Sequence, residues 1–174
     1  VNINTRDFTE RMYIGADAQV SIDWAAGLTT LRAEFIQGDQ PSGYGNTGST
    51  KSVNLNAPVT ADIYKRKFNG AYLYFLQNIM QSPFQAIVKY DWYDPNTEIE
   101  GDEIGKAVTS NAVKTNATDL KFSTLGLGLA YRWDANVKLT AYYDLVSNET
   151  SANLSGYTKD VKDNVFTIRM QVKF

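Results

Sequence analysis

The sequence contains neither cysteine nor histidine among its 174 residues. The absence of cysteine excludes disulfide bonds and thiolate metal sites. The absence of histidine removes the commonest general base, the Ser-His-Asp triad and imidazole metal ligands. We therefore expect no enzymatic activity, no metal centre and no cofactor.

Long hydrophobic runs and a strong excess of one charge are also absent. No apolar run approaches the ~20 residues that a transmembrane helix needs. The formal net charge is -2, which gives no indication of a nucleic-acid-binding surface. The length suits one domain, so we treat residues 1–174 as a single unit.

The clearest positive signal is strict alternation of apolar and polar residues. The last ten residues place Phe166, Ile168, Met170, Val172 and Phe174 on one side and polar residues on the other. A period of two predicts a β-strand with one apolar and one polar face. The segment 12–24 alternates over a length that exceeds the usual ~5–6 residues of a strand. It matches the ~9–11 residues with which a tilted strand crosses a bilayer.

Strands and connections are arranged regularly along the chain. Short connections, which predict tight turns, alternate with long ones, which predict loops. This asymmetry is typical of outer-membrane barrels, with turns in the periplasm and long loops outside. We therefore predict an all-β protein, a transmembrane antiparallel β-barrel with its carboxyl terminus on the periplasmic side of a bacterial outer membrane. The predicted strands are 12–24, 28–37, 65–76, 84–93, 120–133, 137–146 and 164–174, the turns are 25–27, 77–83 and 134–136, and the loops are 38–61, 94–116 and 147–163.

Several runs resemble a known family of channels. The most distinctive is the Tyr-Asp-Trp-Tyr-Asp-Pro-Asn-Thr run at 90–97, and segments 68–79, 101–105, 127–133 and the terminal strand add to it. Over about residues 60–174 the chain resembles the carboxyl-terminal part of phosphate-selective porins O and P, in the form common in Bacteroidetes. The resemblance implies a diffusion channel of roughly sixteen strands, often trimeric. This chain would supply seven of them, and the constricting loop of such a porin would lie in an amino-terminal part that the chain lacks.

Charged residues on the polar side of the predicted strands are candidates for lining the pore. Basic and acidic positions are nearly balanced, so they form no anion ladder, and the phosphate selectivity of the family is not carried over. The alternative is that they form cross-strand ion pairs on a solvated wall. The candidates are Arg32, Glu34, Lys89, Asp91, Arg132, Lys138, Asp144, Arg169 and Lys173, with Asp17 and Asp23 on the same side.

Aromatic residues on the apolar side fall near both ends of the predicted strands. Two such bands predict the aromatic girdles of a membrane barrel. The terminal strand, residues 166–174, resembles the segment by which the barrel assembly machinery recognises its substrates. The girdle candidates are Trp24, Phe84, Tyr90, Trp92, Tyr131, Trp133 and Tyr143.

The leading hypothesis is therefore a passive outer-membrane porin for small hydrophilic solutes or ions, including anions such as phosphate. The alternative is a structural or accessory barrel whose loops bind a partner or surface ligand. A soluble lectin-like sandwich ranks lower. Expected partners are outer-membrane lipid and lipopolysaccharide, the assembly machinery, the remaining strands of the same barrel and further copies in a homotrimer.

Two local features leave alternatives open. The acidic residues Glu98, Glu100, Asp102 and Glu103 could bind a divalent cation, although a solvated acidic loop is the simpler interpretation. The inward glycines of the segment 126–128 match no nucleotide-binding motif, because no helix follows. They are expected to leave room for a large neighbour such as Tyr142 or Phe122.

Overall fold

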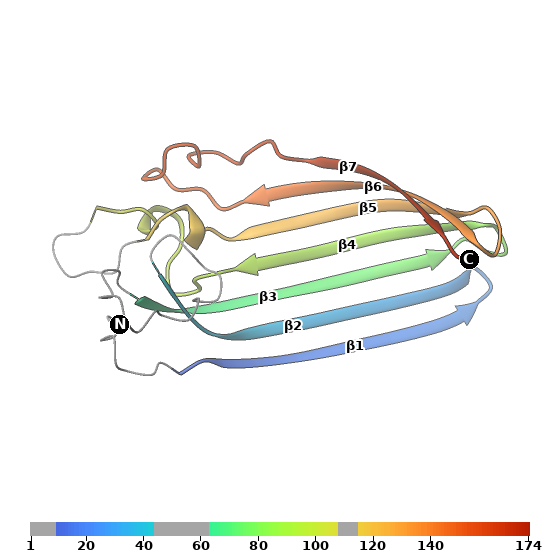
Figure 1. Cartoon of the computed structure of the whole chain (residues 1–174), viewed down its shortest axis with the longest axis horizontal. Coiled ribbons are helices and arrows are strands. Elements are labelled where there is room, and N and C mark those ends of the chain that lie inside the picture. The colour runs from blue at the N-terminus through green and yellow to red at the C-terminus, as the bar shows by residue number, and fades with distance from the viewer. Residues whose placement is uncertain (1–9, 44–62, 108–114) are drawn as a thin grey trace.

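Seven strands form one antiparallel sheet in which each strand pairs with its neighbours in the sequence, in the order β1 to β7 (Figure 1). The computed structural model describes residues 10–43, 63–107 and 115–174. Two short 3₁₀ helices, η1 and η2, lie between β4 and β5. The prediction of an all-β chain with seven strands is confirmed. The elements are β1 (Met12–Trp24), β2 (Gly27–Gly43), β3 (Ile63–Asn78), β4 (Phe84–Asp94), η1 (Gly101–Glu103), η2 (Ala117–Asp119), β5 (Phe122–Arg132), β6 (Val137–Asn148) and β7 (Val165–Val172).

The alternating pattern determines the register of the whole sheet. Residues paired across antiparallel strands lie on the same face, so an apolar row on one strand continues onto the next. A slip of one residue would turn every apolar side chain of a strand to the other face. One complete apolar row runs through Val20, Leu31, Phe75, Val88, Leu127, Tyr143 and Phe166. The adjacent polar row runs through Gln19, Arg32, Tyr74, Lys89, Gly126, Asp144 and Val165. We call the two sides the apolar face and the polar face.

Most of the predicted strand boundaries differ from those of the structure, and three differences have a clear cause or consequence. Residues 38–43, expected in a loop, belong to β2 because β3 continues to pair with them, and Lys65 Nζ lies 3.0 Å from Asp39 Oδ2 there. β5 begins at Phe122 instead of residue 120, because the preceding residues form η2. β7 ends at Val172, so the last two residues lie beyond the strand. The rest of the first predicted loop and the amino-terminal residues 1–9 lie outside the described residues.

Short turns close one end of the sheet. Gly27 adopts a φ of 104°, and a Cβ there would overlap the carbonyl oxygen of Asn78, so only glycine fits this turn. The Asp134 carboxylate accepts hydrogen bonds from the backbone N–H groups of Asn136 and Val137 at 2.7 and 2.8 Å. We call this the turn end, and the opposite end, with the longer connections, the loop end.

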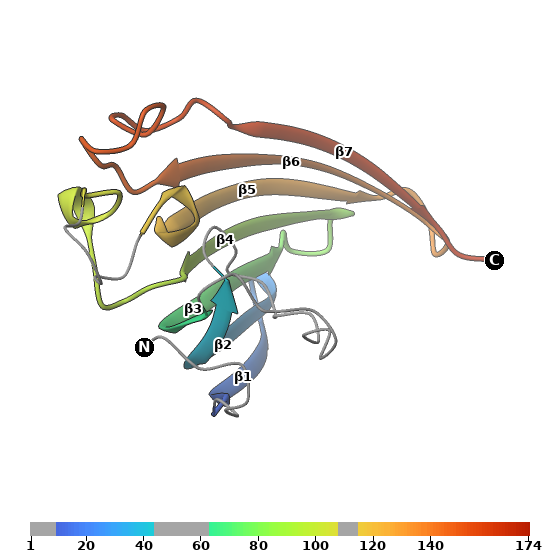
Figure 2. The ribbon, with the colours of Figure 1, turned by 60° about the vertical axis from the view of Figure 1, so that its left-hand side comes forward.

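The sheet is twisted and curved but not closed (Figure 2). β1 and β7 each pair with one strand only, so the seven strands alone do not form the expected barrel. Both outer strands run from the loop end to the turn end, so direct pairing between them would be parallel. Among the described residues, no helix is long and apolar enough to cross a membrane.

Candidate functional site

The polar face is the more enclosed side of the sheet. On β5, the apolar-face residues Leu125, Leu127 and Leu129 are 39%, 46% and 46% exposed. Gly126 and Ala130, which alternate with them on the polar face, are buried. The apolar side chains of the sheet thus point outward, and the polar side chains lie on its more enclosed side.

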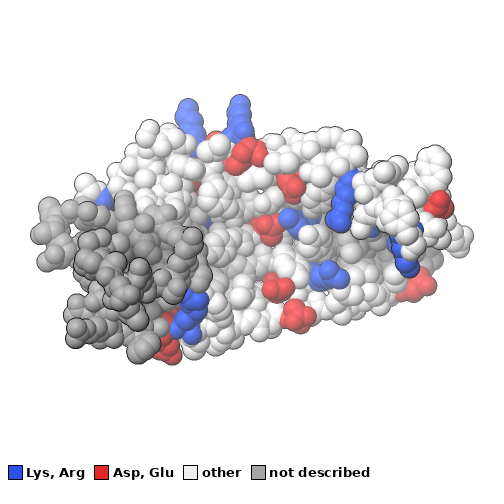
Figure 3. Space-filling view, viewed as in Figure 1, with Lys and Arg blue, Asp and Glu red and all other residues white. Residues whose placement is uncertain are grey.

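Charged residues of both signs meet near the middle of the polar face (Figure 3). One row pairs Asp17 with Glu34 and continues through Tyr72 to Asp91. The next row, two residues further along each strand, contains Arg32 and Lys89. Two residues along a strand span roughly 6.5 Å, so an acidic row lies directly beside a basic one.

Several of these charged side chains bind their neighbours on the same face. The Arg32 guanidinium donates two hydrogen bonds to Gln19 Oε1, at 2.9 and 2.8 Å. Tyr72 is the direct cross-strand neighbour of Glu34. Lys89 Nζ lies 2.6 Å from Asp91 Oδ2 on its own strand. Lys89 and Asp91 therefore form an ion pair within one strand, whereas the alternative expected pairs across strands, and Arg32 binds the neutral Gln19.

A hollow of about 570 Å³ lies over these rows. Its walls combine carboxylates, cations and phenol rings, and the rings of Tyr72 and Tyr74 meet edge to face at 5.5 Å. It can offer both signs of charge to a solute of modest size. The polar lining residues are Arg32, Glu34, Tyr72, Tyr74, Lys89 and Asp91.

The other pore-lining candidates also lie on the polar face, but not all near the hollow. Asp144 pairs with Gly126 in the same row as Lys89. Arg132 and Lys138 are direct cross-strand partners near the turn end, and Arg169 pairs with Thr140. Lys173 follows β7, and its backbone N–H donates to the carbonyl of Asn136 at 2.9 Å. The structure therefore brings the central charges together. Arg132, Lys138, Arg169 and Lys173 lie nearer the turn end, away from the hollow.

The expectation for the inward glycines is confirmed for one neighbour. A Cβ at Gly126 or at Gly128 would overlap the side chain of Tyr142, which extends across both from β6. The absence of side chains on β5 thus provides the space for this ring.

The aromatic residues occupy the apolar face as predicted, but their bands are uneven. At the turn end, Phe84 and Tyr131 are cross-strand partners with ring centroids 5.0 Å apart. Trp133 lies just beyond β5 and packs on Tyr131 at 6.2 Å. Trp24 Nε1 donates to Thr29 at 2.7 Å.

In the other half of the sheet, Tyr90 and Trp92 pack at 6.0 Å on β4. Tyr143 pairs with Phe166 in the row of Leu127, nearer the strand middles, so this band follows no single row. The terminal-strand residues Phe166, Ile168, Met170 and Val172 are all exposed, and Phe174 is fully exposed.

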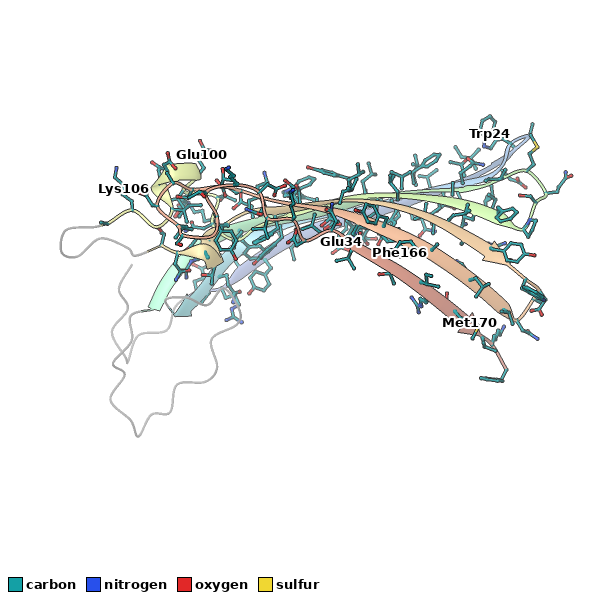
Figure 4. All side chains as sticks on the ribbon, turned by 90° about the horizontal axis from the view of Figure 1, so that it is seen from above. Trp24, Glu34, Glu100, Lys106, Phe166 and Met170 are labelled. Carbon is teal, nitrogen blue, oxygen red and sulfur yellow. The ribbon has the colours of Figure 1, made fainter. Side chains whose placement is uncertain are left out.

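The loop end contains a folded unit that the sequence pattern did not indicate. It comprises residues 95–107, 115–121 and 149–164, and we call it the cap. The Glu149 carboxylate joins its segments, because it accepts from the backbone N–H groups of Gly101 at 2.6 Å and Lys121 at 3.1 Å. Ile104 and Leu120 are fully buried within it. Figure 4 places Glu100 and Lys106 at this end of the sheet and Trp24 and Met170 at the other.

The acidic residues of the cap bind groups of the protein itself. Glu98 pairs with Lys67 at 2.8 Å, and the Asp102 carboxylate accepts from the Ala152 N–H at 2.7 Å. Glu100 and Glu103 form the capping box of η1. Within the described parts of the chain, no three histidine, cysteine or acidic side chains group as metal ligands. The structure thus gives no support to a cation site at 98–103.

A second feature that the sequence did not reveal is a buried ion pair. Arg66 Nε lies 2.6 Å from Asp119 Oδ1, and the two side chains are 2% and 0% exposed. The partners are 53 positions apart. Neither residue belongs to a motif, and the only available signal was the polar-face position of Arg66 near the start of β3.

Comparison with known proteins adds no relative. No family model, no curated protein and no solved structure matches this chain.

Proposed function

We propose that this sheet forms part of the wall of a bacterial outer-membrane porin. Its apolar face contacts lipid, and its polar face lines a channel for small hydrophilic solutes and ions, including anions such as phosphate. The observation that carries the proposal is the apolar face itself, which continues across all seven strands and stays exposed. Soluble monomers rarely expose apolar patches of more than a few hundred Å².

The distribution of buried residues supports the same conclusion. The described residues include only four buried apolar ones: Phe68, Ile104, Leu120 and Ala130. Two of these belong to the cap, so the sheet has almost no hydrophobic core of its own. A soluble domain needs such a core, whereas a membrane strand buries its apolar side in lipid.

Strand lengths and aromatic positions also fit a bilayer. The first six strands contain 11 to 17 residues, and tilted membrane strands need ~9–11. In this arrangement the turn end, with the carboxyl terminus, faces the periplasm and the cap faces outside. Lipopolysaccharide would surround the cap, and the exposed terminal strand would be available to the assembly machinery.

The proposal requires further strands. Unpaired backbone groups in hydrocarbon cost several kcal/mol each, so β1 and β7 need partners in the membrane. Because both outer strands run in the same direction, an odd number of additional strands completes an all-antiparallel barrel. A second copy in the same membrane orientation offers only parallel partners. Copies would therefore associate as closed barrels, as in a homotrimer. A closed barrel of about 19.4 kDa from this chain alone would contradict this argument.

The folded cap favours a second candidate, an accessory barrel that binds a partner through its loops. Hydrogen bonds between loops, such as Ser151 Oγ to the Ile104 carbonyl at 2.7 Å, hold the cap in one shape. A fixed shape suits recognition because little conformational entropy is lost on binding.

Conductance of the purified protein in planar bilayers separates the two candidates. A porin gives steady ohmic steps, and Lys89→Glu shifts the reversal potential toward cation selectivity because Lys89 lies on the polar face. Val88→Ala, one position away on the apolar face, serves as the matched control and leaves the potential unchanged. Absence of conductance in protein that is correctly assembled would favour the accessory barrel.

A further inference from the structure

The cap contacts the sheet from the polar side. Arg66 shares its face of β3 with Phe68 and Tyr72, because strand residues separated by an even number of positions point the same way. The guanidinium of Arg66 meets Asp119, the last residue of η2. The segment that ends at Asp119 therefore lies over the polar face and not over the apolar one.

The Asp119 carboxylate is a buried point at which the cap is held to the sheet. Besides Arg66, it accepts from the Asn96 side-chain amide at 3.0 Å and from the Asn116 N–H at 2.9 Å. Asn96 follows β4 closely, and Asn116 is the N-cap of η2. One fully buried carboxylate thus joins β3, the chain that leaves β4, and η2. A buried charge is tolerated only with such a set of donors.

Hydrogen bonds connect the other segments of the cap to the segment that contains Asp119. Lys121, two residues after Asp119, donates its N–H to Glu149, which also binds Gly101. The Asn153 side chain donates to the Asp102 carbonyl at 2.6 Å. The described parts of the β4–β5 and β6–β7 connections, residues 95–107, 115–121 and 149–164, are therefore one unit.

We infer that the cap is a fixed constriction at the outer mouth of the channel, locked over the polar face by the Arg66–Asp119 pair. It sets the largest solute that reaches the hollow around Arg32 and Glu34. This inference rests on the proposed porin function. It also means that this chain supplies a constriction of its own, which was expected only in an amino-terminal part. Because breaking a buried pair is strongly unfavourable, the constriction is permanent and not a gate.

The lock is tested by hydrogen exchange of the cap in the assembled, detergent-solubilised protein. Asp119→Asn removes the buried carboxylate that pairs with Arg66, so exchange in residues 96–107 and 149–157 accelerates on the order of a hundredfold. Glu98→Gln is the matched control, since it removes a carboxylate from an ion pair that is half exposed on both sides. The control changes exchange by less than about threefold.

The constriction is tested by solute entry into liposomes that contain the same variants, with glucose and the trisaccharide raffinose as probes. Asp119→Asn admits raffinose several-fold faster and changes glucose entry little, while Glu98→Gln resembles the wild type. If Asp119→Asn assembles poorly, the double variant Arg66→Met with Asp119→Leu replaces it. That variant keeps a neutral, packed contact, and wild-type exclusion of raffinose is expected.

Each outcome has a distinct meaning. Unchanged exchange in Asp119→Asn overturns the lock, and faster exchange with unchanged raffinose entry overturns the constriction. Free raffinose entry through the double variant despite a protected cap also overturns the constriction. A wild-type protein that passes neither sugar refutes the porin function itself, while the exchange measurement still reports on the lock.

Discussion

Replacing Leu127 by arginine is the most direct test of which face meets lipid. Leu127 lies at the middle of β5, is 46% exposed, and has Val88 and Tyr143 as cross-strand partners. An arginine at the bilayer midplane destabilises a membrane barrel by about 2–4 kcal/mol. On a soluble sheet, a change at so exposed a position stays within about 0.5 kcal/mol. The membrane interpretation therefore predicts a shift of roughly 30-fold to 900-fold in the unfolding equilibrium, and the soluble one a shift of about twofold at most.

Two matched variants separate the effect of the face of the sheet from the effect of depth in the bilayer. Thr124→Arg adds the same side chain to the same strand on the polar face, opposite Asp91, and is expected to be nearly neutral. Val137→Arg places it on the apolar face at the turn end, where the cost falls to about 0–1 kcal/mol. Urea unfolding of the three variants in lipid vesicles gives the free energies. Equal values for Leu127→Arg and Thr124→Arg would refute the assignment of the faces.

Three further predictions use single sites. Spin labels at positions 125–129 should alternate in accessibility to a lipid-soluble quencher, and a flat profile would contradict the two-faced strand. Gly128→Ala should destabilise the protein by about 1–3 kcal/mol in urea unfolding, because its Cβ overlaps Tyr142, and Tyr142→Ala in the same chain should remove that penalty. Deleting Phe174, which is fully exposed in the structure, should lower the membrane-inserted yield more than the unfolding midpoint; a normal yield would end the argument for a recognition role.

The sequence was sufficient to predict the strands and their faces because the signal is local and repeated. Each strand carries its own period of two, and the seven patterns agree in phase, so Val20 and Phe166 could be assigned to one face without knowledge of any contact. The carboxyl-terminal part of β2 was harder to predict from the sequence. Gly38 and Pro41 have the composition of a loop, and only the continued pairing with Phe68 and Lys65 makes them strand residues.

The cap and the pairing of the charges could not be predicted. The contacts of the cap join residues about fifty positions apart, as in Gly101 with Glu149, and no periodicity marks them. For the polar face, the pattern indicated which residues share it but not their partners. Arg32 binds the neutral Gln19 instead of an acid, because Gln19 is its direct cross-strand neighbour.

The two parts of the molecule bury apolar residues in opposite ways, and the porin proposal explains why. In the cap, Ile104 and Leu120 are fully buried, and the buried polar side chains beside them, Asp119 and Ser151, are hydrogen-bonded. In the sheet, Leu127 and its row point outward, while Gly126 and Ala130 are buried behind them. Lipid removes the need for a core, because apolar side chains there are already out of water. On this proposal, the same chain follows the rule for an aqueous environment at its loop end and the rule for a membrane along its strands.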